Sequence, residues 1–183
     1  AEATADIHFG LMIAIARRMV EGERLVRAGK FPGSQSNHLA GVYVHGKTIG
    51  IVGAGRIGQA TARRARGFGM KIIYWGPRRK PEAERELGME HVSLERLLTE
   101  ADFVSLHPPL NAETHHMISD AQFALMKPTA FIINTARGAV IDEKALVRAL
   151  KKKRIAGAGL DVFEHEPKLP PALKTTKNVV LTP

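Results

Sequence analysis

Apolar residues along this chain fall into two patterns that alternate. Short, mostly apolar runs are typical of buried parallel strands, and they occur at residues 49–52, 71–75, 102–107, 130–134, 155–162 and 178–181. Between them, amphipathic or alanine-rich stretches predict helices over 60–66, 82–87, 94–99, 120–126 and 142–151. Residues 90–92 are either a short strand or an extended link. Strands alternating with helices predict an α/β fold with a doubly wound parallel sheet in three layers, and ligands at the carboxyl ends of its strands.

The start of the chain predicts one long helix over residues 4–29. Apolar side chains recur at every fourth position, at Ile7, Leu11, Ile15 and Met19, which places them on one helical face. This face is wide for a helix that precedes the sheet, so two alternatives stand: it packs against another subunit, or it belongs to the core. Gly29 and Pro32 stop the helix, and residues 30–46 predict an irregular segment.

The glycine-rich turn after the first predicted strand organises the rest of the chain. Gly53, Gly55 and Gly58 form a G-x-G-x-x-G motif between the apolar run 49–52 and a predicted helix. In this context Gly53 permits a tight turn, Gly55 lets a pyrophosphate approach the backbone, and Gly58 lets helix and strand pack closely. Amide groups at the helix start then face an anion. The motif predicts dinucleotide binding on a Rossmann-type sheet; the alternative is a glycine turn without a ligand.

The second strand should end beside the adenosine ribose of such a cofactor. Sites that prefer NAD carry Asp or Glu about 20 residues beyond the glycines, whereas here Trp75 and Gly76 take that place, followed by Arg78 and Arg79. Guanidinium groups bind a 2′-phosphate through paired hydrogen bonds. The sequence therefore favours NADP as the cofactor, with NAD as the second option. The alternative is that these arginines form a solvated basic turn that contacts no cofactor.

The composition is that of one globular domain and excludes several kinds of site. The chain has 183 residues, 44% hydrophobic and 25% charged, and no cysteine, so disulfides and thiolate sites are excluded. The net charge of +9 is dispersed, and seven Phe, two Tyr and one Trp provide no stacking platform for nucleic acid. No apolar run approaches a membrane span, and no signal sequence is visible. We expect a cytoplasmic protein that binds neither nucleic acid nor membrane.

Charged residues follow the later strands, at the edge where ligands are expected. Arg137 comes after the apolar run 130–134, and its guanidinium fork could hold a substrate carboxylate; the alternative is a surface arginine. Asp161 follows a run of small residues that allow a flat ring to approach. Glu164 or Glu166 could hydrogen bond to an imidazole and favour its protonated form.

Hydrolase and metal chemistry are not expected. His107 could be a general base, but its neighbours Pro108 and Pro109 indicate a wall against the cofactor instead. No G-x-S-x-G elbow is present, which argues against a serine hydrolase. His115 and His116 are adjacent and would not share a face in a regular element, so we expect no metal site.

These motifs together resemble the D-isomer-specific 2-hydroxyacid dehydrogenase family over nearly the whole chain. They are Gly46-Lys47-Thr48, Gly55-Arg56-Ile57-Gly58-Gln59, Gly67-Phe68-Gly69-Met70, Leu106-His107-Pro108-Pro109-Leu110 with Thr114, Asn134-Thr135-Ala136-Arg137-Gly138, Gly159-Leu160-Asp161-Val162-Phe163 and Glu166-Pro167. The basic turn at 76–79 is most similar to the glyoxylate/hydroxypyruvate reductase branch. The resemblance implies hydride transfer between NADPH or NADH and a small 2-ketoacid, and a homodimer that uses residues 1–46.

The resemblance also implies roles for individual residues. Arg56 and Ile57 would meet the pyrophosphate through their backbone, and Pro108 would line the cofactor site. Thr135 and Ala136 would lie beside the nicotinamide ribose, and Asp161 would hold the carboxamide. Arg137 would bind the carboxylate and carbonyl of the substrate. Glu166 would pair with a catalytic histidine, which donates the proton in ketoacid reduction.

The sequence departs from the family pattern at its end. The family's histidine follows a Thr-Pro pair, whereas this chain stops at Thr182-Pro183, and the family's substrate domain is missing. We therefore expect residues 1–183 to be a dinucleotide-binding domain that binds cofactor and catalyses little alone. A second hypothesis is a dinucleotide-sensing module, because corepressors in this family keep the fold; the pair Arg137 and Glu166 favours the enzyme.

Overall fold

A computed structural model describes residues 1–34 and 38–183 and shows a seven-stranded, all-parallel sheet with the order β3-β2-β1-β4-β5-β6-β7. The strands are β1 (Thr48–Val52), β2 (Lys71–Trp75), β3 (Met89–His91), β4 (Phe103–Leu106), β5 (Phe131–Asn134), β6 (Gly157–Leu160) and β7 (Val179–Leu181). The doubly wound sheet predicted from the sequence is confirmed, and residues 90–91 of the segment 90–92 belong to the edge strand β3. Strand order reverses between β1 and β4, which is where such sheets bind ligands.

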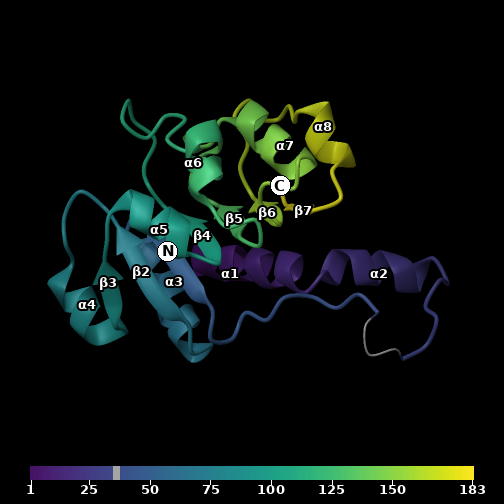
Figure 1. Cartoon of the computed structure of the whole chain (residues 1–183), viewed down its shortest axis with the longest axis horizontal. Helices are drawn as coiled ribbons and strands as arrows, with labels where there is room; N and C mark the ends of the chain where they lie inside the picture. The colour runs from purple at the N-terminus through teal and green to yellow at the C-terminus, as the bar shows by residue number, and fades with distance from the viewer. Residues whose placement is uncertain (35–37) are drawn as a thin grey trace.

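Helices cover both faces of the sheet, as Figure 1 shows. They are α1 (Glu2–Ala16), α2 (Met19–Arg27), α3 (Arg56–Gly67), α4 (Pro81–Leu87), α5 (Leu94–Glu100), α6 (Asp120–Leu125), α7 (Glu143–Lys151) and α8 (Pro171–Thr175), with one 3-10 turn, η1 (Gly138–Val140). Helices α1, α3 and α4 share a core with one face, and α5, α6 and α7 with the other. The three predicted layers are confirmed.

The strands carry apolar side chains on both faces because both faces are covered. All residues of β4, β5 and β6 are buried, which explains why these strands read as continuous apolar runs rather than as alternating patterns. Side-chain caps fix the starts of the short helices: Ser93 accepts the amide of Arg96, and Asp142 accepts the amides of Lys144 and Ala145.

The prediction of one helix over 4–29 is wrong. The helix ends at Ala16, and Arg18 adopts a left-handed conformation with φ of +52° before α2 begins. The amide of Val42 donates to the carbonyl oxygen of Ala16 at 2.8 Å, and a Cβ at Gly41 would lie 2.5 Å from that oxygen. A segment distant in sequence thus crosses the helix at the break and takes over its freed carbonyl group.

Helices α1 and α2 differ in burial. The two alternatives for the apolar face, core packing and packing against another subunit, must therefore be considered for each helix separately. Leu11 and Ile15 are buried against the sheet with other residues of α1, so α1 is ordinary core, although Ile7 is exposed. No residue of α2 is buried, and α2 extends past the sheet (Figure 1). Residues 30–34 and 38–46 form no helix or strand, as predicted; the rest of that segment, 35–37, lies outside the described residues.

Across residues 1–34 and 38–183, the helices are too short or too polar to cross a bilayer.

Candidate functional site

The glycine turn after β1 has the geometry that its motif predicts. Gly53 has φ of +93°, and a Cβ there would lie 3.0 Å from the carbonyl carbon of His107, so the turn after β1 lies directly against the end of β4. A Cβ at Gly58 would lie 2.3 Å from the carbonyl oxygen of Gly53, so only glycine lets α3 approach this closely. Gly55 has no atom within 4 Å of its Cβ position, so the turn is open there.

The first turn of α3 faces this opening without a side-chain cap. Gly55 is the N-cap residue, and no side chain accepts a hydrogen bond from the amides of the first turn of α3. The first turn also contains no acidic residue. Arg56 is exposed, and Ile57 is partly buried. The side-chain amide of Gln59 donates to the carbonyl oxygen of Ala54 at 3.0 Å, which braces the turn from inside. Uncapped amides and the positive end of the helix dipole together suit an anion such as a pyrophosphate.

The basic turn after β2 holds only one uncommitted guanidinium of the predicted pair. Arg79 donates to Glu84 through Nε at 3.1 Å and Nη2 at 2.6 Å, and the Tyr74 hydroxyl donates to the same carboxylate at 2.7 Å. Hydrogen bonds from Arg79 and Tyr74 lower the pKa of Glu84 to about 2. Arg78 is exposed with no ion pair in the described part of the chain. The two arginines are therefore not equivalent.

Four polar side chains form a row where β4 and β5 end; three of them are buried and His107 is partly buried. His8 Nδ1 lies 2.9 Å from Thr135 Oγ1, Ser105 Oγ lies 2.6 Å from His8 Nε2, and Ser105 Oγ lies 2.8 Å from His107 Nε2. Burial lowers the pKa of His8 well below its usual value and that of His107 to about 3, so both rings are neutral near pH 7. Pro108, next to His107, is buried. A neutral, enclosed His107 fits the predicted wall rather than a proton donor.

Asn134 organises the loop that carries Arg137. Its side-chain amide donates to the carbonyl oxygen of Arg137 at 3.0 Å, and its side-chain oxygen accepts the amide of Ala136 at 3.0 Å. Arg137 is exposed and donates to the carbonyl oxygen of Ala136 at 2.6 Å. Because it is exposed, the guanidinium is accessible to a ligand at the carboxyl end of β5.

Two acidic residues, Asp161 and Glu166, follow β6 in the chain. Asp161 accepts the hydroxyl of Thr182 at 2.5 Å, and its amide donates to the carbonyl oxygen of Asn134 at 3.0 Å. Glu166 is exposed and accepts the amide of Phe163 at 2.8 Å. Among the described residues, no hydrogen bond or ion pair joins Glu166 to Arg137, although both lie on loops at the carboxyl ends of adjacent strands.

The histidine pair at 115–116 does not behave as the sequence argument assumed. The two rings stack with centroids 4.0 Å apart, because the pair lies in a turn where His116 has φ of +51° rather than in a regular element. His116 Nε2 lies 2.7 Å from Glu164 Oε1, and ligand atoms of His115, His116 and Glu164 lie within 4.8 Å of one another. The premise that the rings cannot share a face is wrong; the absence of a metal site stays a prediction.

Sequence reasoning missed His8, Ser105 and the role of Asn134. Each is a polar residue within an apolar environment: His8 stands beside Phe9 and Leu11 on α1, and Ser105 interrupts an otherwise apolar strand. A polar side chain on a face that must be buried needs a partner, and that signal was available in the sequence. The identity of the partners was not.

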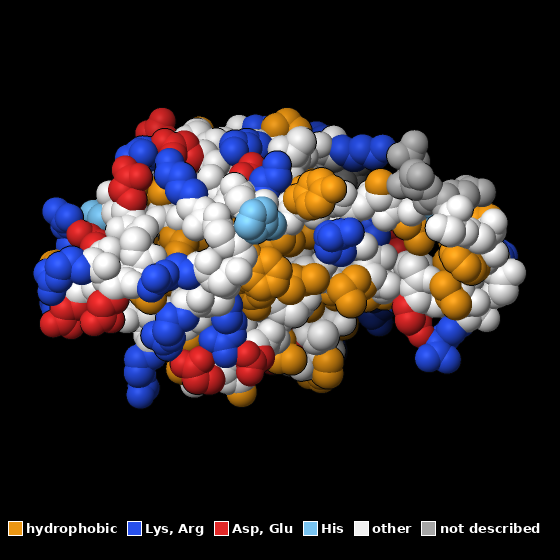
Figure 2. All heavy atoms as spheres, turned by 90° about the horizontal axis from the view of Figure 1, so that it is seen from below, with side chains coloured by type: hydrophobic (Ala, Val, Ile, Leu, Met, Phe, Trp, Pro, Cys, Tyr) orange, Lys and Arg blue, Asp and Glu red, His pale blue; other side chains and the backbone are white. Residues whose placement is uncertain are grey.

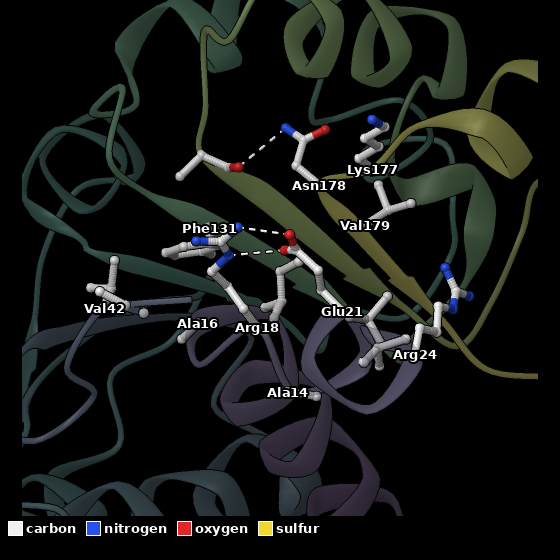
Figure 3. A pocket seen from close by; sticks show the side chains of 16 residues that line it. Ala14, Ala16, Arg18, Glu21, Arg24, Val42, Phe131, Lys177, Asn178 and Val179 are labelled. Atoms are coloured by element: carbon white, nitrogen blue, oxygen red, sulfur yellow. Dashed lines mark hydrogen bonds and ion pairs between the residues drawn. The ribbon is translucent and has the colours of Figure 1, made fainter. Parts of the chain in front are cut away.

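A separate hollow of about 620 Å³ lies at the opposite end of the sheet. Its lining includes Phe131 and Val179, which start their strands, and Arg18 at the break between α1 and α2. Figure 3 shows Arg18 paired with Glu21 in its centre and the amide of Asn178 bonded to a backbone carbonyl behind it. Because it lies at the amino ends of the strands, this hollow is not part of the candidate dinucleotide site.

Several known proteins with similar sequences or structures are reductases, and others are putative 2-hydroxyacid dehydrogenases. The chain is 56% identical over 186 residues to a glyoxylate reductase of Thermococcus litoralis, covering 100% of the chain and 56% of that protein. The crystal structure of a glyoxylate reductase from Paecilomyes thermophila matches with a TM-score of 0.91 and 45% identity, covering 100% of the chain and 54% of that one. The structure of an acyclic imino acid reductase in complex with NADPH and D-Arg matches with a TM-score of 0.89 and 36% identity. The match covers 100% of this chain and 57% of the reductase.

The chain thus spans about half the length of these relatives. A family model described as D-isomer specific 2-hydroxyacid dehydrogenase, NAD binding domain, matches residues 9–183, a range that contains the glycine turn, Arg137 and Glu166. The resemblance drawn from the motifs is confirmed: the chain belongs to the D-isomer specific 2-hydroxyacid dehydrogenase family, as a domain of its NAD-binding type.

Proposed function

We propose that this chain is the cofactor-binding part of an enzyme that reduces a small 2-ketoacid, such as glyoxylate or hydroxypyruvate, with NADPH or NADH. The observation that carries the proposal is the open turn at Gly55 beside the uncapped start of α3, on the same sheet edge as exposed Arg137. One part suits a diphosphate and the other a carboxylate.

The residues divide the work according to their positions. Arg56 and Ile57 would present backbone amides to the pyrophosphate, and Asp161 would hold the carboxamide. Arg137 would bind the substrate carboxylate, and its loop is held in place by Asn134. The bound dinucleotide would supply the hydride, while the protein positions and polarises. Glu166 would orient a histidine that lies outside the 183 residues. The substrate domain would also be contributed by sequence outside these residues.

The preference for NADP rests on the basic turn. Arg78 is exposed, and Arg79 already pairs with Glu84, so Arg78 would contact the 2′-phosphate first. Arg79 would contribute by its charge and by fixing the turn. The related imino acid reductase binds NADPH, which supports the proposal; NADH remains the second cofactor.

The sensor hypothesis has no comparable support. The similar proteins are reductases and putative 2-hydroxyacid dehydrogenases, and a sensor has no need for both an exposed arginine and an exposed acid on the loops after adjacent strands.

We also propose that α2 and the described residues that follow it, 28–34 and 38–46, form a homodimer contact. Met19, Val26 and Tyr43 are 56%, 58% and 74% exposed, and large exposed apolar patches mark interaction surfaces. Figure 2 shows apolar side chains gathered across the middle of the face seen from below. The hollow beside Arg18 adds a concave element to this surface. The expected cytoplasmic location stays a prediction.

A titration of the chain with NADPH, followed by nucleotide fluorescence, tests the cofactor site. Gly55→Ala adds a Cβ where a pyrophosphate would approach, at a backbone conformation that alanine can adopt. We expect at least tenfold weaker binding. Gly67→Ala adds the same atom to open space at the other end of α3 and should bind as the parent does. Equal affinities for the two variants would contradict the proposed site. Glyoxylate-dependent oxidation of NADPH by the full-length enzyme tests the reaction.

A further inference from the structure

The row formed by His8, Ser105, His107 and Thr135 connects the core helix α1 to the loop beside the proposed cofactor site. Its three contacts are 2.6, 2.8 and 2.9 Å long, within normal hydrogen-bond distance. His8 and Ser105 are 0% exposed and Thr135 is 7% exposed. The two middle members of the row are therefore fully buried, and its two ends are Thr135, which keeps a small exposed fraction, and His107, which is partly buried.

The number of hydrogen-bond donors in the row is fixed by the chemistry of its side chains. A neutral imidazole has one donor nitrogen and one acceptor nitrogen, and a hydroxyl has one donor. Both rings are neutral because burial disfavours their charged forms. Ser105 Oγ contacts Nε2 of both rings and makes no other hydrogen bond within the described chain.

Only two arrangements satisfy every member of the row. In the first, Thr135 donates to His8 Nδ1, His8 Nε2 donates to Ser105, and Ser105 donates to His107 Nε2. In the second, every hydrogen bond is reversed, and His8 Nδ1 donates to Thr135. If both rings carried their proton on Nε2, the buried Ser105 hydrogen would have no acceptor; if neither did, two lone pairs would compete for it. Each failure leaves a buried polar atom unpaired, which is unfavourable by about 1–3 kcal/mol.

We propose that His8 and Ser105 act as a two-way hydrogen-bond relay that sets whether the Thr135 hydroxyl donates or accepts toward the bound dinucleotide. In the first arrangement the hydroxyl hydrogen is held by His8, so Thr135 offers only lone pairs to the ligand. In the second, its hydrogen is free for a ligand oxygen. This role for Thr135 rests on the proposed function and on the position beside the nicotinamide ribose that the family resemblance implies for this residue.

His8 is thus a positioning residue that acts through Thr135. It stands on α1, 127 residues before Thr135 in sequence, and its ring also packs against that of His107 with centroids 4.4 Å apart. An apolar residue at position 8 would fill the space but leave Thr135 free to rotate. A ligand would then have to restrict that rotation, which weakens binding.

Nitrogen-15 NMR of the histidine rings in the 183-residue chain tests the relay directly. At pH 7.5 we expect His8 and His107 to be neutral and to occupy opposite tautomers: Nε2–H on His8 with Nδ1–H on His107, or the reverse. The same tautomer in both rings, or a charged ring, would overturn the relay. This experiment needs no ligand, so its outcome is separate from that of the proposed function.

Dinucleotide titration of three variants tests the consequence for binding. His8→Leu removes both contacts and should weaken NADPH binding about three- to tenfold, as expected for one lost hydrogen bond. His8→Gln keeps one donor and one acceptor and should recover most of the affinity. Ile15→Ala, a core change on the same helix, should lower the melting temperature without changing affinity. If Leu and Gln variants bind equally, or if Ile15→Ala weakens binding as much as His8→Leu, the relay is wrong. If the parent binds no dinucleotide, the proposed function fails, whatever the tautomers are.

Discussion

Gly138 lies so close to Phe163 that a Cβ at position 138 would be 1.9 Å from the carbonyl carbon of Phe163. The loop that carries Arg137 and the loop that carries Glu166 are therefore in direct backbone contact. The amide of Glu164 extends this contact by donating to the buried carboxylate of Glu143 at 2.8 Å. The relative position of Arg137 and Glu166, the two proposed substrate-side groups, therefore depends on a glycine at position 138.

Gly138→Ala should separate these loops. The new methyl group cannot be accommodated without moving backbone, and overpacking of this kind lowers stability by roughly 1–3 kcal/mol. Urea unfolding measures that loss, and glyoxylate turnover of the full-length enzyme should fall at least tenfold because Arg137 is displaced. Gly10→Ala, which adds the same group to open space on α1, is the matched control and should be neutral or slightly stabilising. Unchanged stability in Gly138→Ala would contradict the packing.

Stability should fall as the pH drops from 6.5 to about 5. His8 and His107 have lowered pKa values in the folded chain, so the unfolded chain binds more protons below its own histidine pKa of about 6.5. Their contribution is present above that pKa and is lost as the pH falls toward the folded values. Each histidine lowers the free energy of unfolding by roughly 1.4 kcal/mol per pH unit well below 6.5.

Unfolding experiments at several pH values measure this slope. His8→Gln should remove about half of it, because one of the two rings with lowered pKa values is gone. His165→Gln replaces an exposed ring, 77% accessible at its side chain, and should keep the full slope. A parent protein whose stability does not change over this range would argue against buried, neutral histidines.

The basic turn should contribute unequally to cofactor choice. Arg78→Ala should weaken NADPH binding about tenfold and leave NADH unchanged, because an exposed guanidinium that contacts the 2′-phosphate is lost. Arg79→Ala should have a smaller effect, since Glu84 already holds that side chain. The double variant should have no preference. Arg85→Ala, in the last turn of α4, is the control; a parent with equal affinity for both dinucleotides would refute the turn argument.

Charge on α2 should abolish dimerisation. Met19 and Val26 are exposed, so Met19→Glu combined with Val26→Glu should leave the fold intact while placing two carboxylates in an apolar contact. Sedimentation should then change from dimer to monomer at equal melting temperature. Leu125→Glu puts a charge on an exposed apolar position of α6, on another part of the surface, and should remain dimeric. A monomeric parent would remove the proposed contact altogether.

The extent of sequence-based prediction differs between the fold and the site. The strands were recognisable because both of their faces are covered, which makes each an apolar run, and β1 with the glycine turn could be placed because its glycines have separate steric roles. The ion pair between Arg79 and Glu84 was not recognisable, because nothing in the sequence spacing indicates that Glu84 binds Arg79 rather than Arg78. The stacking of His115 on His116 depends on a turn conformation that no periodicity indicates.

The sequence alone determined the parallel α/β sheet and the family, and it predicted the edge at which we propose that ligands bind. These follow from local periodicity and from short motifs whose meaning does not depend on distant parts of the chain. The tertiary structure decided the break after Ala16, where Val42 takes over a helix carbonyl, and the burial of His8 between Ser105 and Thr135. These features join residues far apart in the chain, and such partners are chosen by the packing of the whole domain rather than by the neighbours of either residue.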